Sequence, residues 1–236
     1  MSVSVALHTI GQTPRPDLTP FLVSALGVPD IVVTGALNGL SLTEIPPCST
    51  SGFPLETRLS DGTRVEVDAA FLAPLLQANI DENEEKVQLH IVLCAGEFPT
   101  LKSEGALIRP FEHACDVFIS KGYERLMVVV PFDEQVDPAK RKWQNAGFEV
   151  SVRSMQARPI KSPADQWLIS LAAGQDANAF VLDYVGYSRS ILNRVREALP
   201  TPIYDLGYLA TDFARAIIQE WDELEEKVLT STDSID

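Results

Sequence analysis

Residues 89–99, Leu89-His90-Ile91-Val92-Leu93-Cys94-Ala95-Gly96-Glu97-Phe98-Pro99, decide the fold of this chain. The apolar run at the start predicts a buried strand, and the small residues and the proline after Cys94 predict that a loop begins there. A second apolar run, Phe180-Val181-Leu182, leads in the same way into Asp183-Tyr184-Val185-Gly186-Tyr187. Open α/β sheets bind ligands outside the carboxyl ends of their strands. We therefore expect the Cys94 thiol to face a partner from another strand end, in an arrangement suited to proton transfer at carbon.

Strands and helices alternate along most of the chain. The expected strands cover residues 3–10, 31–34, 89–93, 126–130, 148–152, 179–182 and 202–204, and the expected helices cover residues 17–26, 68–80, 110–121, 137–146, 163–173, 188–199 and 208–227. Asp17 and Ser188 are expected to cap the helices that follow them, and Asp61-Gly62 between two alternating runs predicts a hairpin. Continuous β-branched runs between helices indicate parallel strands that are buried on both faces. The sequence thus predicts an α/β fold of two similar parallel-sheet lobes with a ligand cleft between them.

The composition of this 236-residue chain disfavours several classes of partner. The formal net charge is −14, and the sequence has no basic footprint for nucleic acid or for an anionic membrane surface. It has no apolar stretch of about 18 residues to span a membrane, and its amino terminus is typical of a first strand and not of a signal peptide. Three dispersed cysteines, Cys48, Cys94 and Cys115, suit a reducing cytoplasm and predict no metal site. We expect a cytoplasmic protein that binds a small molecule, with a homo-oligomer among the open alternatives.

Three motifs carry a resemblance to a known family. They are Thr9-Ile10-Gly11-Gln12-Thr13-Pro14-Arg15-Pro16-Asp17, Leu93-Cys94-Ala95-Gly96-Glu97-Phe98 and Leu182-Asp183-Tyr184-Val185-Gly186-Tyr187. With them the chain resembles AroM-like proteins over residues 3–218, and these look like members of the wider aspartate/glutamate racemase superfamily. The resemblance implies two pseudo-symmetric α/β lobes, with residues 1–110 and a returning helix, 207–228, in the first and residues 111–206 in the second. Residues 229–236 are acidic and rich in Ser and Thr, which predicts a disordered tail.

The resemblance also implies a chemistry. Racemases of this superfamily need no cofactor, bind a carboxylate-bearing substrate between the lobes, and use two cysteines on opposite faces of the substrate. This chain has Cys94, but Tyr184 stands where the second cysteine is expected. Ionising a tyrosine at pH 7 requires roughly 4 kcal/mol, about twice the value for a thiol, so Tyr184 is a poor base that can still donate a proton. We expect one-sided proton transfer, of racemase, isomerase or decarboxylase type, with Cys94 as the single acid or base. The alternative is a small-anion-binding or regulatory protein that keeps the cleft without catalysis.

Other residues are predicted to hold the anionic group of the substrate. Arg15 offers a bidentate fork for a carboxylate, or is a surface residue of a turn. Glu97 is either a proton relay or a solvated charge, Asp183 either caps a turn or contacts the ligand, and Tyr187 either binds the ligand or packs between the lobes. The complete predicted site comprises the catalytic pair Cys94 and Tyr184 and the binding residues Gly11, Gln12, Thr13, Arg15, Ala95, Gly96, Glu97, Asp183, Gly186, Tyr187 and Ser188, with no metal. His8 is expected to be a packed imidazole outside this site.

Overall fold

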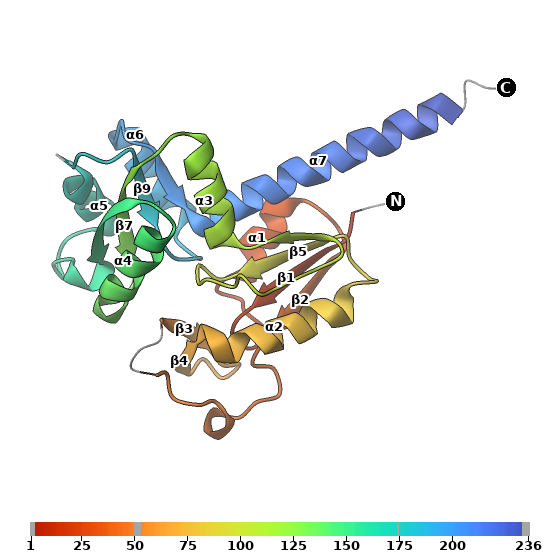
Figure 1. Ribbon diagram of the computed structural model, residues 1–236, viewed down its shortest axis with the longest axis horizontal. Helices are drawn as coiled ribbons and strands as arrows, with labels where there is room; N and C mark the ends of the chain where they lie inside the picture. The colour runs from red at the N-terminus through yellow and green to blue at the C-terminus, as the bar shows by residue number, and fades with distance from the viewer. Residues whose placement is uncertain (1–2, 50–52, 174, 233–236) are drawn as a thin grey trace.

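The structure is a computed structural model that describes residues 3–49, 53–173 and 175–232. Within these residues, two four-stranded parallel sheets form the framework (Figure 1). The first sheet has the strand order β2-β1-β5-β6, with β1 at Val5–Thr9, β2 at Ile31–Gly35, β5 at Leu89–Leu93 and β6 at Ala106–Ile108. The second has the order β10-β9-β7-β8, with β7 at Arg125–Val130, β8 at Glu149–Ser154, β9 at Ala179–Leu182 and β10 at Ile203–Asp205. Each sheet and the helices that cover it form one lobe, so the predicted fold is confirmed.

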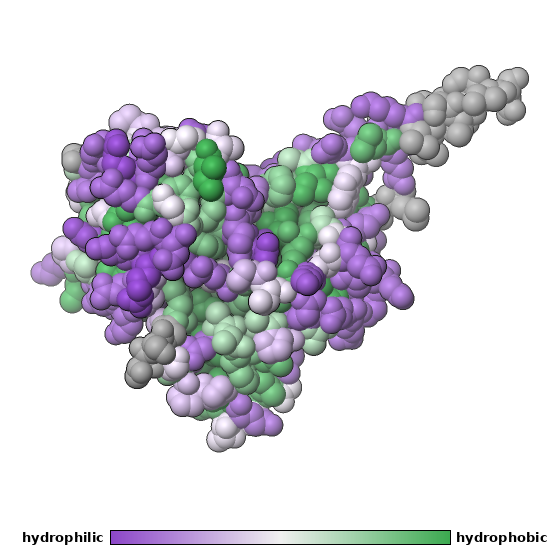
Figure 2. Space-filling model, in the orientation of Figure 1, coloured by the Kyte–Doolittle hydropathy of each residue, from purple (hydrophilic) through white to green (hydrophobic). Residues whose placement is uncertain are grey.

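Helices cover both faces of each sheet. In the first lobe, α2 (Ala69–Asn83) covers one face, and α1 (Thr19–Leu26) and α7 (Leu206–Thr232) cover the other. In the second lobe, α3 (Pro110–Ser120) and α4 (Val136–Asn145) lie opposite α5 (Ala164–Ala172) and α6 (Arg189–Ala198). Short 3-10 helices lie at Leu42–Glu44, Asp133–Gln135 and Met155–Ala157. On the face shown in Figure 2, hydrophilic residues cover much of the second lobe, and hydrophobic residues gather over the middle of the molecule.

Strand β5 lies inside the first sheet and determines where Cys94 points. It pairs with β1 on one side and with β6 on the other. Because side chains alternate between the two faces of a strand, Leu93 packs toward α1 and α7, whereas Val92 and Cys94 pack toward α2. Cys94 follows the last residue of β5, so its thiol lies at the carboxyl edge of the sheet.

A hairpin reaches from the first lobe to the second. Its strands are β3 (Pro54–Arg58) and β4 (Arg64–Asp68), as predicted, and Gly62 has the positive φ of 86° that its turn requires. Gly11 approaches the hairpin so closely that a Cβ there would lie 2.4 Å from the carbonyl oxygen of Arg58. From the second lobe, Gln135 donates its Nε2–H to the carbonyl oxygen of Pro54 at 2.8 Å. The hairpin is thereby fixed to both lobes.

Helix α7 belongs to the cores of both lobes. Leu206 and Leu209, at its start, pack with the second sheet, whereas Ala210, Ala214 and Ile218 pack with the first. Figure 1 shows that the helix then projects beyond the body of the molecule. It continues through Thr232, so residues 229–232 of the predicted tail are helical, and residues 233–236 lie outside the described residues. Within the described part of the chain, no helix has the length and apolar character needed to cross a membrane.

Several local predictions differ from the structure. Strand β6 (Ala106–Ile108) was not predicted, because it follows β5 with no helix between them and so departs from the alternation of strands and helices. Asp17 does not cap α1: the cap position is Leu18, and the Asp17 carboxylate instead accepts hydrogen bonds from Arg15. Ser188 does occupy the cap position of α6, but its hydroxyl bonds the hydroxyl of Ser190 at 2.8 Å and not the helix backbone.

Candidate active site

A cavity of about 60 Å³ lies between the lobes, where β1, β5, β7 and β9 end. A buried water molecule needs roughly 10–15 Å³ of such space, so the cavity has room for a small molecule. The hairpin closes one side of it. The lining residues are Ile10, Arg15, Leu18, Phe53, Leu55, Glu56, Thr57, Leu93, Cys94, Ala95, Gly96, Pro131, Phe132, Gln135, Asp183, Tyr184 and Val185.

The Cys94 thiol lines this cavity but is largely withdrawn from water. Burial raises its pKa to about 12, against the amide of Gly96 and the charge of Lys142, which lower it. The Gly96 N–H donates to the Cys94 Sγ at 3.3 Å. The negative charges of Asp183 and Glu112 raise the pKa further. At neutral pH the thiol therefore keeps its proton.

A buried ion pair lies next to Cys94. The Lys142 ammonium donates to Asp183 Oδ1 at 2.8 Å and to the carbonyl oxygen of Ala95 at 2.8 Å. The indole N–H of Trp143 donates to the other Asp183 oxygen, also at 2.8 Å. Asp183 is thus neither a turn cap nor a free ligand group, although it reaches the cavity wall. Lys142 was not predicted as part of the site. Its helical spacing could have indicated it, because it lies on one face of α4 with Ala139 and Trp143.

Tyr184 reaches the same cavity from the second lobe. Burial raises the pKa of its hydroxyl from the ordinary value, so Tyr184 is an even weaker base than its residue type implies. Its ring lies edge-on against Tyr187, with the centroids 5.7 Å apart. Among the described residues, its hydroxyl has no hydrogen-bond partner. The Tyr184 O–H is therefore available as a donor to a ligand.

Arg15 also lines the cavity, but its fork is occupied. Its Nε–H and one Nη2–H donate to the Asp17 carboxylate at 2.8 and 2.9 Å, and Nη1 donates to Thr9 and Thr57 at 3.2 and 3.3 Å. The expected bidentate contact is therefore made within the protein. Of the five guanidinium N–H groups, one on Nη2 remains for a ligand.

The remaining predicted residues divide between the cavity and its surroundings. Ala95 and Gly96 line it with Arg15, Cys94, Asp183 and Tyr184, whereas Gly11, Gln12, Thr13, Glu97, Gly186, Tyr187 and Ser188 do not. The Gln12 side chain is fully bonded to backbone: it donates to the carbonyl oxygens of Leu37 and Leu40 and accepts from the Ser60 N–H. Thr13 bonds Asn38. These first-motif residues thus hold the neighbouring loops and the hairpin in place.

Two further polar side chains at the cavity escaped the sequence reasoning. Gln135 Oε1 is buried and has no partner among the described residues, while Nε2 is held by Pro54. Burial raises the pKa of Glu56. Both are hydrogen-bond acceptors. Within the described residues, no group of three or more His, Cys, Asp or Glu side chains is placed to hold a metal ion.

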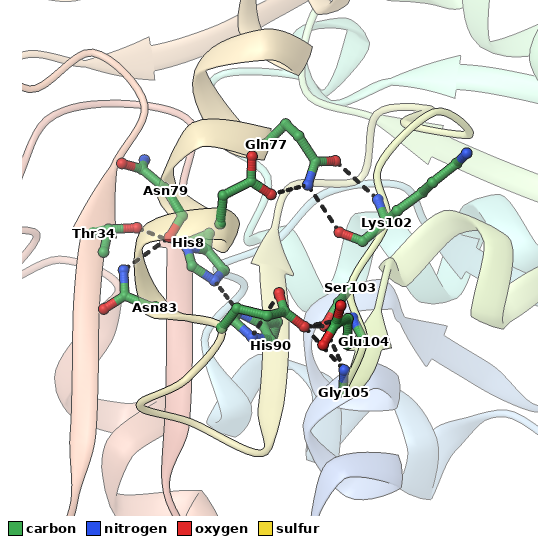
Figure 3. Close-up of polar contacts among 12 residues, drawn as sticks. His8, Thr34, Gln77, Asn79, Asn83, His90, Lys102, Ser103, Glu104 and Gly105 are labelled. Carbon is green, nitrogen blue, oxygen red and sulfur yellow. Dashed lines mark hydrogen bonds and ion pairs between the residues drawn. The ribbon is translucent and has the colours of Figure 1, made fainter.

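A second polar network lies in the first lobe, apart from the cavity (Figure 3). The ring of His8 bonds Thr34 Oγ1 at 2.7 Å and His90 Nδ1 at 2.9 Å. His90 Nε2 faces the Glu84 carboxylate at 3.8 Å, and Glu84 in turn accepts from Ser103. His8 is fully buried, so its expected place as a packed imidazole is confirmed.

Two parallel-sheet lobes around a cavity that contains a cysteine define an α/β protein of the racemase type, and solved structures share this fold. Allantoin racemase from Klebsiella pneumoniae is 16% identical with a TM-score of 0.59, over 92% of this chain and 88% of that one. The maleate isomerase Iso from Pseudomonas putida S16 is 13% identical with a TM-score of 0.54, over 93% of both chains. Arylmalonate decarboxylase is 10% identical with a TM-score of 0.57, over 91% of this chain and 92% of that one.

Residues 5–220 match the family model of the AroM protein, and the chain belongs to this family. The expected membership of the AroM family is thus confirmed, and the solved structures share the expected fold. No curated protein matches the chain.

Proposed function

We propose that this protein catalyses cofactor-independent proton transfer to a carbon atom of a small carboxylate, with Cys94 as the single acid. The observation that carries the proposal is a protonated cysteine in the wall of a small cavity between the lobes, at the carboxyl ends of the strands. The fold is shared with a racemase, an isomerase and a decarboxylase. The proposal places the reaction in the cytoplasm.

The protonation state of Cys94 favours an acid over a base. With its pKa raised to about 12, ionising the thiol at pH 7 requires roughly 7 kcal/mol. Donating the proton to a carbanion has no such cost, because a carbanion is a far stronger base than a thiolate. Tyr184 cannot supply the missing base, because burial raises its pKa as well. The pair therefore suits protonation of one face, as in a decarboxylase or isomerase, better than two-way racemisation.

In the decarboxylation form of this reaction, the bond between the substrate carbon and its carboxylate breaks and CO₂ leaves. The electron pair stays on the carbon as an enediolate, which takes the proton of Cys94 Sγ, and the thiolate is then protonated by water. The Tyr184 O–H and the remaining Nη2–H of Arg15 are the donors that can stabilise the negative charge as it develops on the enediolate. Phe53 and Phe132 supply apolar walls that exclude water.

Deuterium incorporation tests this proposal. The protein is incubated in D₂O with a panel of small malonates, α-hydroxy acids and α-amino acids, and the products are analysed by NMR and chiral chromatography. We expect one deuterium on one face of the product from at least one substrate. Cys94→Ala should lower the rate by at least about 100-fold, the usual value of a general acid. Cys48→Ser, at a half-buried cysteine that bonds Asp68, is the matched control and should leave the rate unchanged. Incorporation on both faces, or an unaffected Cys94→Ala variant, would contradict the proposal.

The alternative function is a small-anion-binding protein without catalysis. It is favoured by the pairing of two cations within the protein. The Arg15 guanidinium already binds the Asp17 carboxylate, and the Lys142 ammonium already binds the Asp183 carboxylate. A cavity with paired charges can hold a ligand without activating it. Saturable binding of a small acid by calorimetry, with no deuterium incorporated by any member of the panel, would select this alternative.

A further inference from the structure

The Lys142–Asp183 pair joins the two loops that carry the proposed proton-transfer residues. Lys142 comes from α4 of the second lobe, and its ammonium bonds the carbonyl oxygen of Ala95, the residue after Cys94 in the first lobe. The same ammonium bonds Asp183, the residue before Tyr184. One ammonium group therefore links the loop after β5 to the loop after β9 across the cleft.

The surroundings of the pair hold it in place. The side chains of Lys142 and Asp183 are 1% and 0% exposed. Trp143 donates to the second oxygen of Asp183, and the ammonium lies 4.5 Å from the ring centroid of Phe111 and 5.0 Å from that of Phe53. Aromatic faces attract a cation, so these rings stabilise the Lys142 ammonium in addition to Asp183. A buried pair with these partners is costly to break from either end.

The two charges act on the Cys94 thiol in opposite directions. The Lys142 ammonium favours the thiolate, and the Asp183 carboxylate opposes it. The other groups that act on Cys94 are the Gly96 amide, which favours the thiolate, and Glu112 of α3, which opposes it. Glu97, in the same loop, is itself influenced by both members of the pair. Removing the Asp183 charge should therefore favour the Cys94 thiolate, and removing the Lys142 charge should oppose it.

We propose that Lys142 and Asp183 are positioning residues for Cys94, because their ion pair fixes its loop against the Tyr184 loop and balances the charge beside its sulfur. The role of Cys94 as an acid rests on the proposed function, but the effect of the pair on the thiol does not need a substrate. The two proposals can therefore fail independently.

The test is the rate at which iodoacetamide alkylates Cys94 in the full chain between pH 7 and 10, followed by peptide mass spectrometry. Asp183→Asn keeps the shape of the side chain and removes its charge, so it should alkylate at least about tenfold faster, which corresponds to one pKa unit. Lys142→Met removes the opposite charge and should alkylate at least about tenfold more slowly. Lys142→Met combined with Asp183→Leu removes both charges and should return to within about threefold of the wild type. Cys48, which does not line the cavity, is the internal reference in every sample.

A role limited to packing makes a different prediction. Loosening the site from either end would expose Cys94, so both single variants would alkylate faster, and this result would overturn the proposal. Unchanged rates in both single variants would overturn it equally. If Lys142→Met does not fold, the test compares Asp183→Asn with Lys142→Arg. Lys142→Arg keeps the charge and should alkylate at a rate near that of the wild type. A slower or unchanged rate in Asp183→Asn then refutes the charge balance.

Discussion

Two buried groups far apart in the sequence should give this protein opposing responses to mild acid. Burial, and then the charge of His90, lower the pKa of His8 from 6.5 to about 3. Burial raises the pKa of Asp205 from 3.8 to about 7, against the amides of Tyr208 and Gly207. Between pH 4.5 and 6.5, unfolding would let His8 take up a proton and would make Asp205 release one. His8 therefore lowers the stability on acidification, and Asp205 raises it.

The size of each effect follows from the width of the window. One proton bound differently in the folded and unfolded states changes the free energy of unfolding by about 1.4 kcal/mol per pH unit. Both groups are already partly titrated at pH 6.5, so over the two pH units from 6.5 to 4.5 each contributes about 2.5 kcal/mol, with opposite sign. In the wild-type protein these two contributions should therefore nearly cancel. Relative to the wild type, His8→Gln should gain about 2.5 kcal/mol on acidification, and Asp205→Asn should lose about as much.

Urea unfolding at pH 4.5, 5.5 and 6.5 measures these slopes for the wild type and the two variants. Each substitution also changes the free energy of unfolding at every pH, because replacing a buried polar side chain has its own cost. The comparison therefore uses the change with pH within each variant and not its absolute stability at pH 6.5. The other titrating groups are common to both variants, so the difference between their changes isolates His8 and Asp205, and it should reach about 5 kcal/mol. Parallel pH profiles for the two variants would refute the reasoning.

Three further substitutions have defined outcomes in urea unfolding at pH 7. Gly186 has a φ of 123°, so Gly186→Ala should cost about 1–3 kcal/mol, and an unchanged midpoint would show that the loop relaxes freely. Ile218→Ala, in the part of α7 packed on the first lobe, should lose about 2–4 kcal/mol. Leu224→Ala, at a side chain that is 51% exposed, should stay within about 0.5 kcal/mol of the wild type. Similar losses in both variants would contradict the packing described. Trp143→Phe leaves one oxygen of buried Asp183 without its donor and should cost about 1–3 kcal/mol, so a stability equal to the wild type would argue against that hydrogen bond.

The framework of this fold could be predicted from sequence because its strands are buried on both faces. Runs such as Leu126 to Val130 have no polar residue to suggest another structure, and Asp61-Gly62 marks the hairpin turn. Strand β6 had no comparable signal, because it follows β5 without a helix between them, whereas the equally short edge strand β10 lies between two helices. Its position is determined by the sheet and not by its own residues.

The candidate site was predictable only in part, for a related reason. Cys94 and Tyr184 follow strands of facing sheets, so topology alone brings them to one cavity. Periodicity places Lys142 on the buried stripe of α4, but it does not show that Lys142 pairs with Asp183 or that Asp17 pairs with Arg15. Asp17, two residues after Arg15, neutralises its fork, and Lys142 looks like a solvated cation because it follows Lys140 and Arg141. Burial of one cation among three is decided by packing against Phe53 and Phe111.

Helix α7 also has a consequence for the order in which the chain can fold. The strands and two of the covering helices of the first lobe leave the ribosome early, but the face that needs Ala210, Ala214 and Ile218 stays uncovered until the second lobe has been synthesised. Domains normally fold as units from the amino terminus during synthesis. Here the first lobe must wait for α7, so a nascent chain should expose apolar strands of that lobe until this helix has emerged.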